Sequence, residues 1–189
     1  MRPTVPRLPA LQLDEFDDRQ RQLVGLVDPQ FTTVPNAVLT LVRDPALYEA
    51  FLPLATKLLI DSAFSVRHRE LVILRTAVLV DSHYEWGQHV VLARDEFTDD
   101  DFRRIVAGAD APGWNDIEAA RLRAVDELHE HAGISDATWT QLAAGFDEHQ
   151  LVQLPFTASR GHQLTQGLAR SWARGSHDAM SLRGAQRLR

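Results

Sequence analysis

Apolar residues recur every three or four positions along most of the chain, the spacing that places them on one face of an α-helix. An Asp-Pro pair at 44–45 starts one such segment, which carries Leu47, Phe51, Leu54 and Leu58. Sustained alternation of apolar and polar residues, which would indicate a strand, is absent, as are Asn-Gly and Asp-Gly hairpin turns. The sequence therefore predicts an all-α fold.

Side chains that can cap a helix mark the expected starts, because their oxygen accepts a free backbone N–H of the first turn. Asn115 with Glu118 three residues later resembles a capping box. The segment that follows Ser65 is apolar on most sides, which is typical of a central helix. Helices are expected over 14–27, from 44, over 65–80, over 82–94, from 98, over 115–131, from 135 and from 147, with Pro155 a local irregularity in the last.

The chain divides into three parts. Residues 1–13 contain three prolines and no clear period, which predicts an extended N-terminal arm lying on the body or on a neighbour. Residues 14–174 carry the helical period and form one expected domain. Residues 175–189 lose the period, so we expect a C-terminal tail that is mobile or held in an oligomer.

Composition narrows the function classes. Hydrophobic residues make up 44% of the 189 residues and charged residues 24%, which is ordinary globular usage. The net charge of −6 argues against nucleic acid as a partner. The apolar stretch 71–80 is interrupted by Arg75 and is too short for a bilayer, and the prolines near the N-terminus do not suit a signal peptide. We expect no membrane partner and a cytoplasmic location.

The absence of cysteine excludes disulfides, thiolate nucleophiles, cysteine-ligated zinc and iron–sulfur clusters. The histidines do not follow the His-Glu-x-x-His spacing, and no Gly-x-Gly-x-x-Gly follows a strand. The sequence therefore predicts neither a metal nor a nucleotide cofactor.

Titratable residues that could carry chemistry cluster between positions 70 and 89. Ser82, Glu85 and His89 are spaced so that they share one stripe of a helix. Glu85, four residues before His89, could orient the imidazole and raise its pKa. Glu70 lies on the apolar central helix, where burial would raise the pKa of its carboxyl group and make it a usable acid or base. We predict Glu70, Glu85 and His89 as catalytic residues.

Each of these residues also has a structural interpretation. An exposed Glu85–His89 pair would be an ordinary solvated ion pair worth a few tenths of a kcal/mol. Glu70 could pair with Arg69 or with Arg75, or simply be the first polar residue of a helix start. These alternatives stay open at the level of spacing alone.

Substrate contacts are predicted from the groups that the chemistry needs. Arg75 and Arg160 could bind a carboxylate bidentately. Tyr84 or Ser82 could donate to a developing enolate oxygen. Trp86 and Tyr84 could line the substrate site, although aromatic residues at this spacing are more often core or interface anchors.

The stretch from about 35 to 154 resembles the carboxymuconolactone decarboxylase family, which is related to the alkyl hydroperoxidase D (AhpD) type. The resemblance implies an AhpD-like helical bundle with a central helical hairpin, assembled into trimers or hexamers. The residues that carry it are Pro35, Asn36, Arg69, Glu70, the Leu74–Ala77 segment, Tyr84, Glu85, Trp86, His89 and Trp139.

The redox branch of that family uses a Cys-x-x-Cys pair followed by a histidine. The two cysteine positions correspond to Ser82 and Glu85 here, with His89 as the histidine and Glu70 as an upstream acid. Without a thiol there is no disulfide to cycle, so peroxidase chemistry is not expected. The resemblance therefore favours the non-redox, decarboxylase-like branch.

Together these observations predict a cofactor-independent acid/base enzyme, most simply a lyase that decarboxylates a small carboxylated lactone or β-keto acid. One alternative is an isomerase, hydratase or cyclase acting on an enolisable ketone. Another is a non-catalytic helical oligomer that binds a small acid. Self-association is also suggested by large side chains near expected helix ends, namely Trp114, Trp139, Trp172 and Phe156.

Overall fold

A computed structural model describes the backbone of residues 8–164 and the side chains of residues 8–159. Within this part the regular structure is entirely helical, which confirms the predicted all-α class. The elements are a short 3-10 helix (Leu13–Glu15), α1 (Asp18–Gly25), α2 (Asn36–Leu41), α3 (Pro45–Leu59), α4 (Val66–Leu79), α5 (His83–Leu92), α6 (Asp99–Ala107), α7 (Asp116–His131), α8 (Asp136–Ala143) and α9 (Glu148–Leu164).

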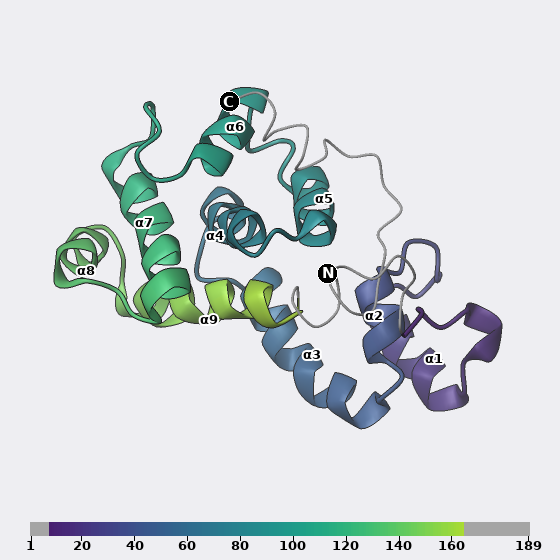
Figure 1. Ribbon diagram of the computed structural model, residues 1–189. Helices are drawn as coiled ribbons and strands as arrows, with labels where there is room; N and C mark the ends of the chain where they lie inside the picture. The colour runs from purple at the N-terminus through teal and green to yellow at the C-terminus, as the bar shows by residue number, and fades with distance from the viewer. Residues whose placement is uncertain (1–7, 165–189) are drawn as a thin grey trace.

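Helix α4 is the centre of the fold, as its apolar sequence predicts. It packs against α5, α6, α7 and α9, which surround it in Figure 1. Eight consecutive residues, from Glu70 to Ala77, are buried. A polar side chain that α4 points inward is therefore enclosed by protein and needs a partner there.

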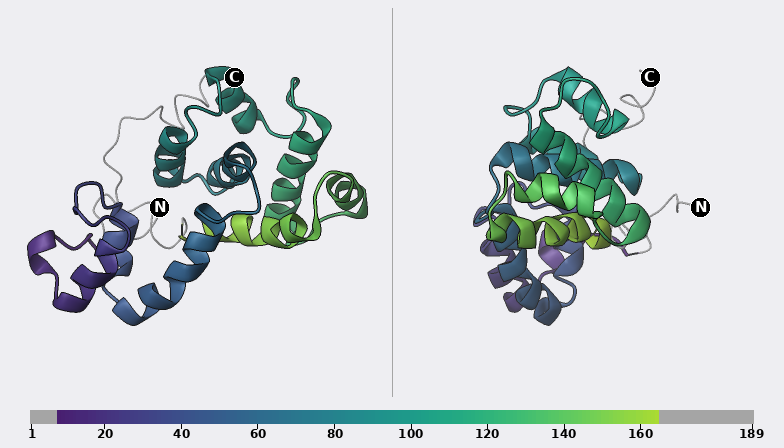
Figure 2. Two further views of the ribbon diagram at one scale, coloured as in Figure 1. Left: turned by 180° about the vertical axis from the view of Figure 1, so that it is seen from behind. Right: turned by 90° about the vertical axis from the view of Figure 1, so that its left-hand side faces the viewer.

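Helices α1, α2 and α3 gather on one side of the molecule (Figures 1 and 2). They share a hydrophobic cluster built from Leu11, Phe16, Leu23, Val24, Val42 and Tyr48. The backbone N–H of Leu11 donates to the carbonyl of Leu39 at 3.1 Å, so this part of the expected N-terminal arm lies on α2. Residues 1–7 of that arm lie outside the described residues.

The capping residues read from the sequence begin six of the helices. Each accepts the backbone N–H three residues further along, which satisfies a donor that the first turn leaves free. These caps are Asp44, Ser65, Ser82, Thr98, Asn115 and Ser135. The predicted starts of α3 to α8 are confirmed, and Asp147 accepts from the N–H of Gln150 at 2.8 Å ahead of α9.

Two expectations near the N-terminus were wrong. The first long helix begins at Asp18 and is capped by Asp17, whereas Asp14 belongs to the preceding 3-10 turn. Asp17 is the N-cap because its carboxylate and the Gln20 side chain form a reciprocal capping box. Helix α2 was not expected, because six residues are too few to show a period.

The C-terminal helix continues through Pro155, which lies inside α9. The tail expected over 175–189 lies outside the described residues. Among the helices that the structure describes, none combines the length and the apolar character needed to cross a membrane.

Candidate active site

Helices α4 and α5 form the central hairpin, joined by a turn of three residues. Ser82 ends the turn and caps α5, and its N–H donates to the carbonyl of Ala77 at 2.8 Å. Asp81 adopts a left-handed conformation with φ of 52°, which reverses the chain. The tight turn brings residues near the start of α4 close to residues near the end of α5.

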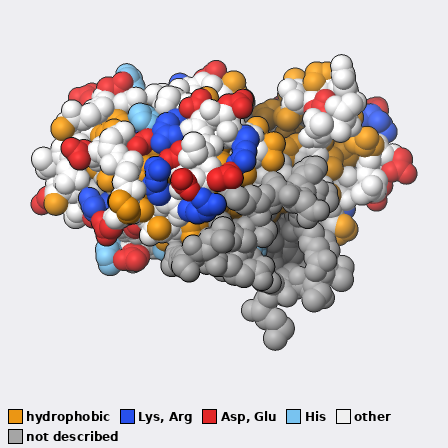
Figure 3. Space-filling view, turned by 90° about the horizontal axis from the view of Figure 1, so that it is seen from above, with side chains coloured by type: hydrophobic (Ala, Val, Ile, Leu, Met, Phe, Trp, Pro, Cys, Tyr) orange, Lys and Arg blue, Asp and Glu red, His pale blue; other side chains and the backbone are white. Residues whose placement is uncertain are grey.

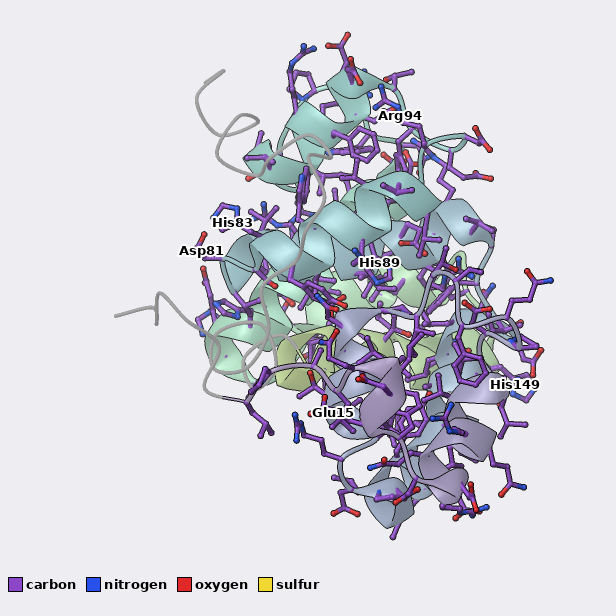
Figure 4. All side chains as sticks on the ribbon, turned by 90° about the vertical axis from the view of Figure 1, so that its right-hand side faces the viewer. Glu15, Asp81, His83, His89, Arg94 and His149 are labelled. Carbon is purple, nitrogen blue, oxygen red and sulfur yellow. The ribbon has the colours of Figure 1, made fainter. Side chains whose placement is uncertain are left out.

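The hairpin brings Glu70, Glu85 and His89 together. Nδ1 of His89 lies 2.6 Å from Oε2 of Glu70, and Nε2 lies 3.2 Å from Oε2 of Glu85. The exposed fractions are 0% for Glu70, 9% for Glu85 and 6% for His89. Figure 4 shows His89 inside the molecule, whereas His83 lies at the outer end of α5 beside Asp81. The sequence interpretation of Glu85–His89 as an exposed, solvated pair is therefore wrong.

The two carboxylates determine the charge of the imidazole. Burial alone would lower the pKa of His89, but hydrogen bonds to Glu70 and Glu85 reverse the effect and raise the pKa to about 9. His89 is therefore protonated at neutral pH, and both ring nitrogens donate. A protonated ring offers no lone pair to a metal ion.

Glu70 is ionised, contrary to the expectation that burial would raise its pKa. Burial does favour the neutral acid, but the hydrogen bonds from His89 and Arg69 outweigh it and hold the pKa of Glu70 below its ordinary value. The carboxylate that burial was expected to make into a proton donor is instead the fixed counter-charge of the imidazolium.

Arg69 anchors this carboxylate. Its Nε donates to Oε1 of Glu70 at 2.9 Å, and its Nη1 donates to the carbonyl of Leu59 at 2.6 Å. Leu59 is the last residue of α3, so Arg69 links the site to the C-terminal end of a third helix. Arg69, Glu70, His89 and Glu85 thus form a row of alternating charges. The structural interpretation in which Glu70 pairs with Arg69 is confirmed.

Ser82 and Tyr84, expected to touch substrate, are both hydrogen-bonded to backbone. Ser82 is 2% exposed, and its Oγ accepts the N–H of Glu85 as the cap of α5. The phenolic oxygen of Tyr84 accepts the N–H of Ala37 at 3.1 Å, joining α5 to α2. Burial raises the pKa of Tyr84 to about 12, so the phenol keeps its proton. Both residues shape the hairpin that carries the site.

Trp86 lies in the hydrophobic core rather than beside the three titratable residues. Its side chain is 0% exposed and packs edge-on against Phe102, with ring centroids 6.1 Å apart. The expectation that Trp86 contacts substrate is not supported, because the ring is enclosed by core residues. The core interpretation of this residue fits the structure.

Arg75 is held elsewhere by a partly buried ion pair. Its Nε and Nη2 donate to the two carboxylate oxygens of Asp126 at 2.6 and 3.1 Å, and its Nη1 donates to the carbonyls of Ile105 and Val106. These bonds occupy the fork that would bind a substrate carboxylate, so the expected role is wrong. The side chain of Arg160, the other arginine candidate, lies outside the described residues.

The sequence predicted that Glu70, Glu85 and His89 act together, but it did not reveal the direct hydrogen bond between Glu70 and His89. Spacing along α5 relates Glu85 to His89, but only the path of the turn brings α4 alongside. No group of three or more histidine, aspartate or glutamate side chains among the described residues is arranged to hold a metal ion.

Comparison with known families places this site in context. Residues 45–127 match the carboxymuconolactone decarboxylase family, a stretch that includes all three residues of the buried cluster. A search of functionally curated proteins found no significant relative.

Solved structures share the fold at low sequence identity. A peroxidase-related protein from Silicibacter sp. TM1040 superposes with a TM-score of 0.73 at 16% identity, covering 92% of this chain and 95% of its own. The alkylhydroperoxidase AhpD core protein from Ralstonia eutropha JMP134 gives 0.72 at 18% identity, with coverages of 87% and 88%. The debrominase Bmp8 gives 0.73 at 12% identity, with coverages of 92% and 95%. The AhpD-like fold predicted from the sequence is therefore confirmed.

Proposed function

We propose that the protein, whose residues 45–127 match the carboxymuconolactone decarboxylase family, is a cofactor-independent acid/base enzyme that moves a proton at a carbon next to a carbonyl group. The observation that carries the proposal is the buried imidazolium of His89 between two carboxylates. Structural ion pairs also shift pKa values, but a charged, enclosed relay of three titratable groups is typical of proton-transfer sites.

Glu85 is the base in this proposal. Its side chain is 12% exposed, whereas that of Glu70 is fully enclosed, which favours Glu85 as the carboxylate that meets the substrate. When Glu85 takes a proton from carbon, the electron pair of the C–H bond moves into an enolate. The imidazolium of His89 beside it stabilises the negative charge, and the proton then returns to the same or to a neighbouring carbon.

Glu70 and Arg69 position the imidazole. Glu70 accepts from Nδ1, which fixes the ring orientation and leaves Nε2 directed at Glu85. Arg69 adds to the effect of His89 in holding the pKa of Glu70 below its ordinary value, through its hydrogen bond to Oε1. Neither residue needs to touch substrate, because each acts through His89.

Decarboxylation of a small β-keto acid or carboxylated lactone is the second candidate, favoured by the family match. It would generate the same enolate by loss of CO₂ and use the same proton delivery. It also needs a cation for the substrate carboxylate. Arg75 is committed to Asp126, so proton abstraction from an uncharged ketone or lactone is the first candidate.

The test is proton exchange measured by NMR. Wild type is incubated in D₂O with a panel of enolisable ketones, lactones and β-keto acids, with CO₂ release followed in parallel. Glu85→Gln removes the base, and Glu96→Gln, an exposed residue shortly after α5, is the matched control. We expect exchange by wild type and the control and a loss of at least 100-fold, of the order expected for a general base, in Glu85→Gln. If wild type shows neither proton exchange nor CO₂ release, the proposal of an enzyme is wrong and a role in binding alone remains.

A further inference from the structure

Arg121 of α7 is a second enclosed cation, unrelated to the proton-transfer cluster. Its side chain is 0% exposed, and Nε, Nη1 and Nη2 have no hydrogen-bond partner. Arginine stays charged in proteins, and buried donors are nearly always paired, because an unmatched polar group costs several kcal/mol. The donors of Arg121 therefore call for an acceptor.

Two aromatic rings cover the guanidinium. Its carbon lies 4.9 Å from the ring centroid of Phe64 and 4.3 Å from that of Phe146. The two rings contact each other edge to face at 5.6 Å. Contact with aromatic faces stabilises the positive charge but accepts none of the N–H groups in the guanidinium plane. An acceptor would therefore bind at the edge of the guanidinium plane of Arg121, where its N–H groups point.

The surroundings of Arg121 are short of negative charge. Glu118 attracts it electrostatically, but Oε1 of Glu118 accepts from Arg67 at 2.7 Å. His68, whose ring lies against Phe146, is also near, and burial together with the charge of Arg121 lowers the pKa of His68. His68 is therefore neutral at neutral pH and half-buried, so it borders solvent on this side.

We propose that the edge of Arg121 binds a small anion, either chloride or a short carboxylate such as formate, that enters beside His68. One such anion accepts several in-plane N–H groups at once and neutralises the enclosed charge. The complete enclosure of the guanidinium excludes bulky anions. The site is built by α7, the start of α4 and the connection between α8 and α9, away from His89.

The test is anion-dependent thermal stability at constant ionic strength. Sodium chloride or sodium formate replaces sodium gluconate stepwise, for wild type, Arg121→Met and Arg123→Met. Arg123 is the matched control, since it lies on the same helix in an exposed pair with Asp110. We expect a saturable rise of several degrees in Tm for wild type and Arg123→Met and none for Arg121→Met. Of chloride and formate, the anion that reaches half of its effect on Tm at the lower concentration is the preferred ligand.

A second measurement needs no variant. Chloride exchanging with a protein site broadens the ³⁵Cl NMR signal, and we expect formate to reverse the broadening produced by wild type. The proposal is overturned if Tm responds equally to the anions in all three proteins, or if no saturable response and no reversible broadening occurs. Either result would leave ordered water as the acceptor.

Discussion

Nδ1 of His89 lies 2.6 Å from Oε2 of Glu70, although 19 positions separate the two residues in the sequence. The bond is enclosed by protein and joins a cation to an anion, so its energy depends on both charges. Folding therefore fixes the protonation of His89, and pH becomes a probe of the site.

Stability should fall at alkaline pH. The pKa of His89 rises from 6.5 to about 9 on folding, so its contribution is complete below pH 6.5 and is lost as pH rises through about 9. This pKa shift corresponds to a contribution of about 3 kcal/mol to the free energy of unfolding. Urea unfolding at pH 6 to 10 measures it, with His89→Gln as the reference that should lack this component. Parallel pH curves for the two proteins would contradict the assignment.

Turnover should depend on His89 more than on any exposed histidine. We expect His89→Gln to lower kcat about 10²- to 10³-fold, the usual cost of removing a group that stabilises the negative charge of an enolate. His131→Gln, at the exposed end of α7, is the control and should retain wild-type activity. Rates are measured on whichever compound shows exchange, with circular dichroism confirming the fold. An active His89→Gln variant would rule out the relay.

Arg69 should change the pKa of the His89 imidazole without contacting the ring. Arg69→Gln removes a positive charge from Glu70, so the pKa of His89 should rise further above about 9. Nitrogen-15 NMR of the imidazole across the pH range measures the change. Arg94→Gln, which breaks an exposed pair with Asp99, should leave the value where it is. Equal titration in wild type and Arg69→Gln would show that Arg69 is structural only.

Loss of Arg75 should act on stability rather than on substrate binding. Arg75→Met leaves the partly exposed Asp126 and the carbonyls of Ile105 and Val106 without their donor, at a cost of about 1–3 kcal/mol of unfolding free energy. Arg123→Met breaks an exposed pair and should cost at most about 1 kcal/mol. Urea denaturation compares the two. A Michaelis constant that rises in Arg75→Met while stability is unchanged would restore its substrate role.

We also expect the chain to self-associate through apolar side chains that the fold leaves exposed. Val152 and Phe156, four residues apart on α9, are 65% and 53% exposed. Size-exclusion chromatography with light scattering should give a trimer or hexamer for wild type and a smaller species for the double variant Val152→Ser, Phe156→Ser. A wild-type monomer at micromolar concentration would refute the prediction. In Figure 3, further hydrophobic side chains gather near the side of the molecule formed by α1 to α3.

The sequence was most informative where the interaction was local. The caps at Ser65 and Ser82 were predictable because acceptor and donor lie three residues apart. Contacts between distant segments were not. Arg75 meets Asp126 across 51 positions, and Tyr84 meets Ala37 across 47. The identity of a residue alone does not reveal whether its side chain is already bonded to a distant segment of the chain and is therefore not free to bind a substrate.

The same distinction explains the site residues. Glu85 and His89 share one helix, so their proximity followed from spacing. Glu70 was recognised as an inward-facing acid, but its charge state was wrong because the two donors that keep it ionised were not visible from α4 alone. Packing therefore decided which carboxylate is fully enclosed as the counter-charge of His89 and which keeps some exposure to solvent.

The left-handed turn at Asp81 has a consequence for the order in which the protein folds. Because it joins α4 and α5 directly, Glu70, Glu85 and His89 come from one continuous stretch, 66–92, so only short loops must close to bring them together. Such nearby contacts form early during folding. Glu70, Glu85 and His89 can thus come together early, and the N-terminal helices then brace them through two later contacts, Leu59 with Arg69 and Ala37 with Tyr84.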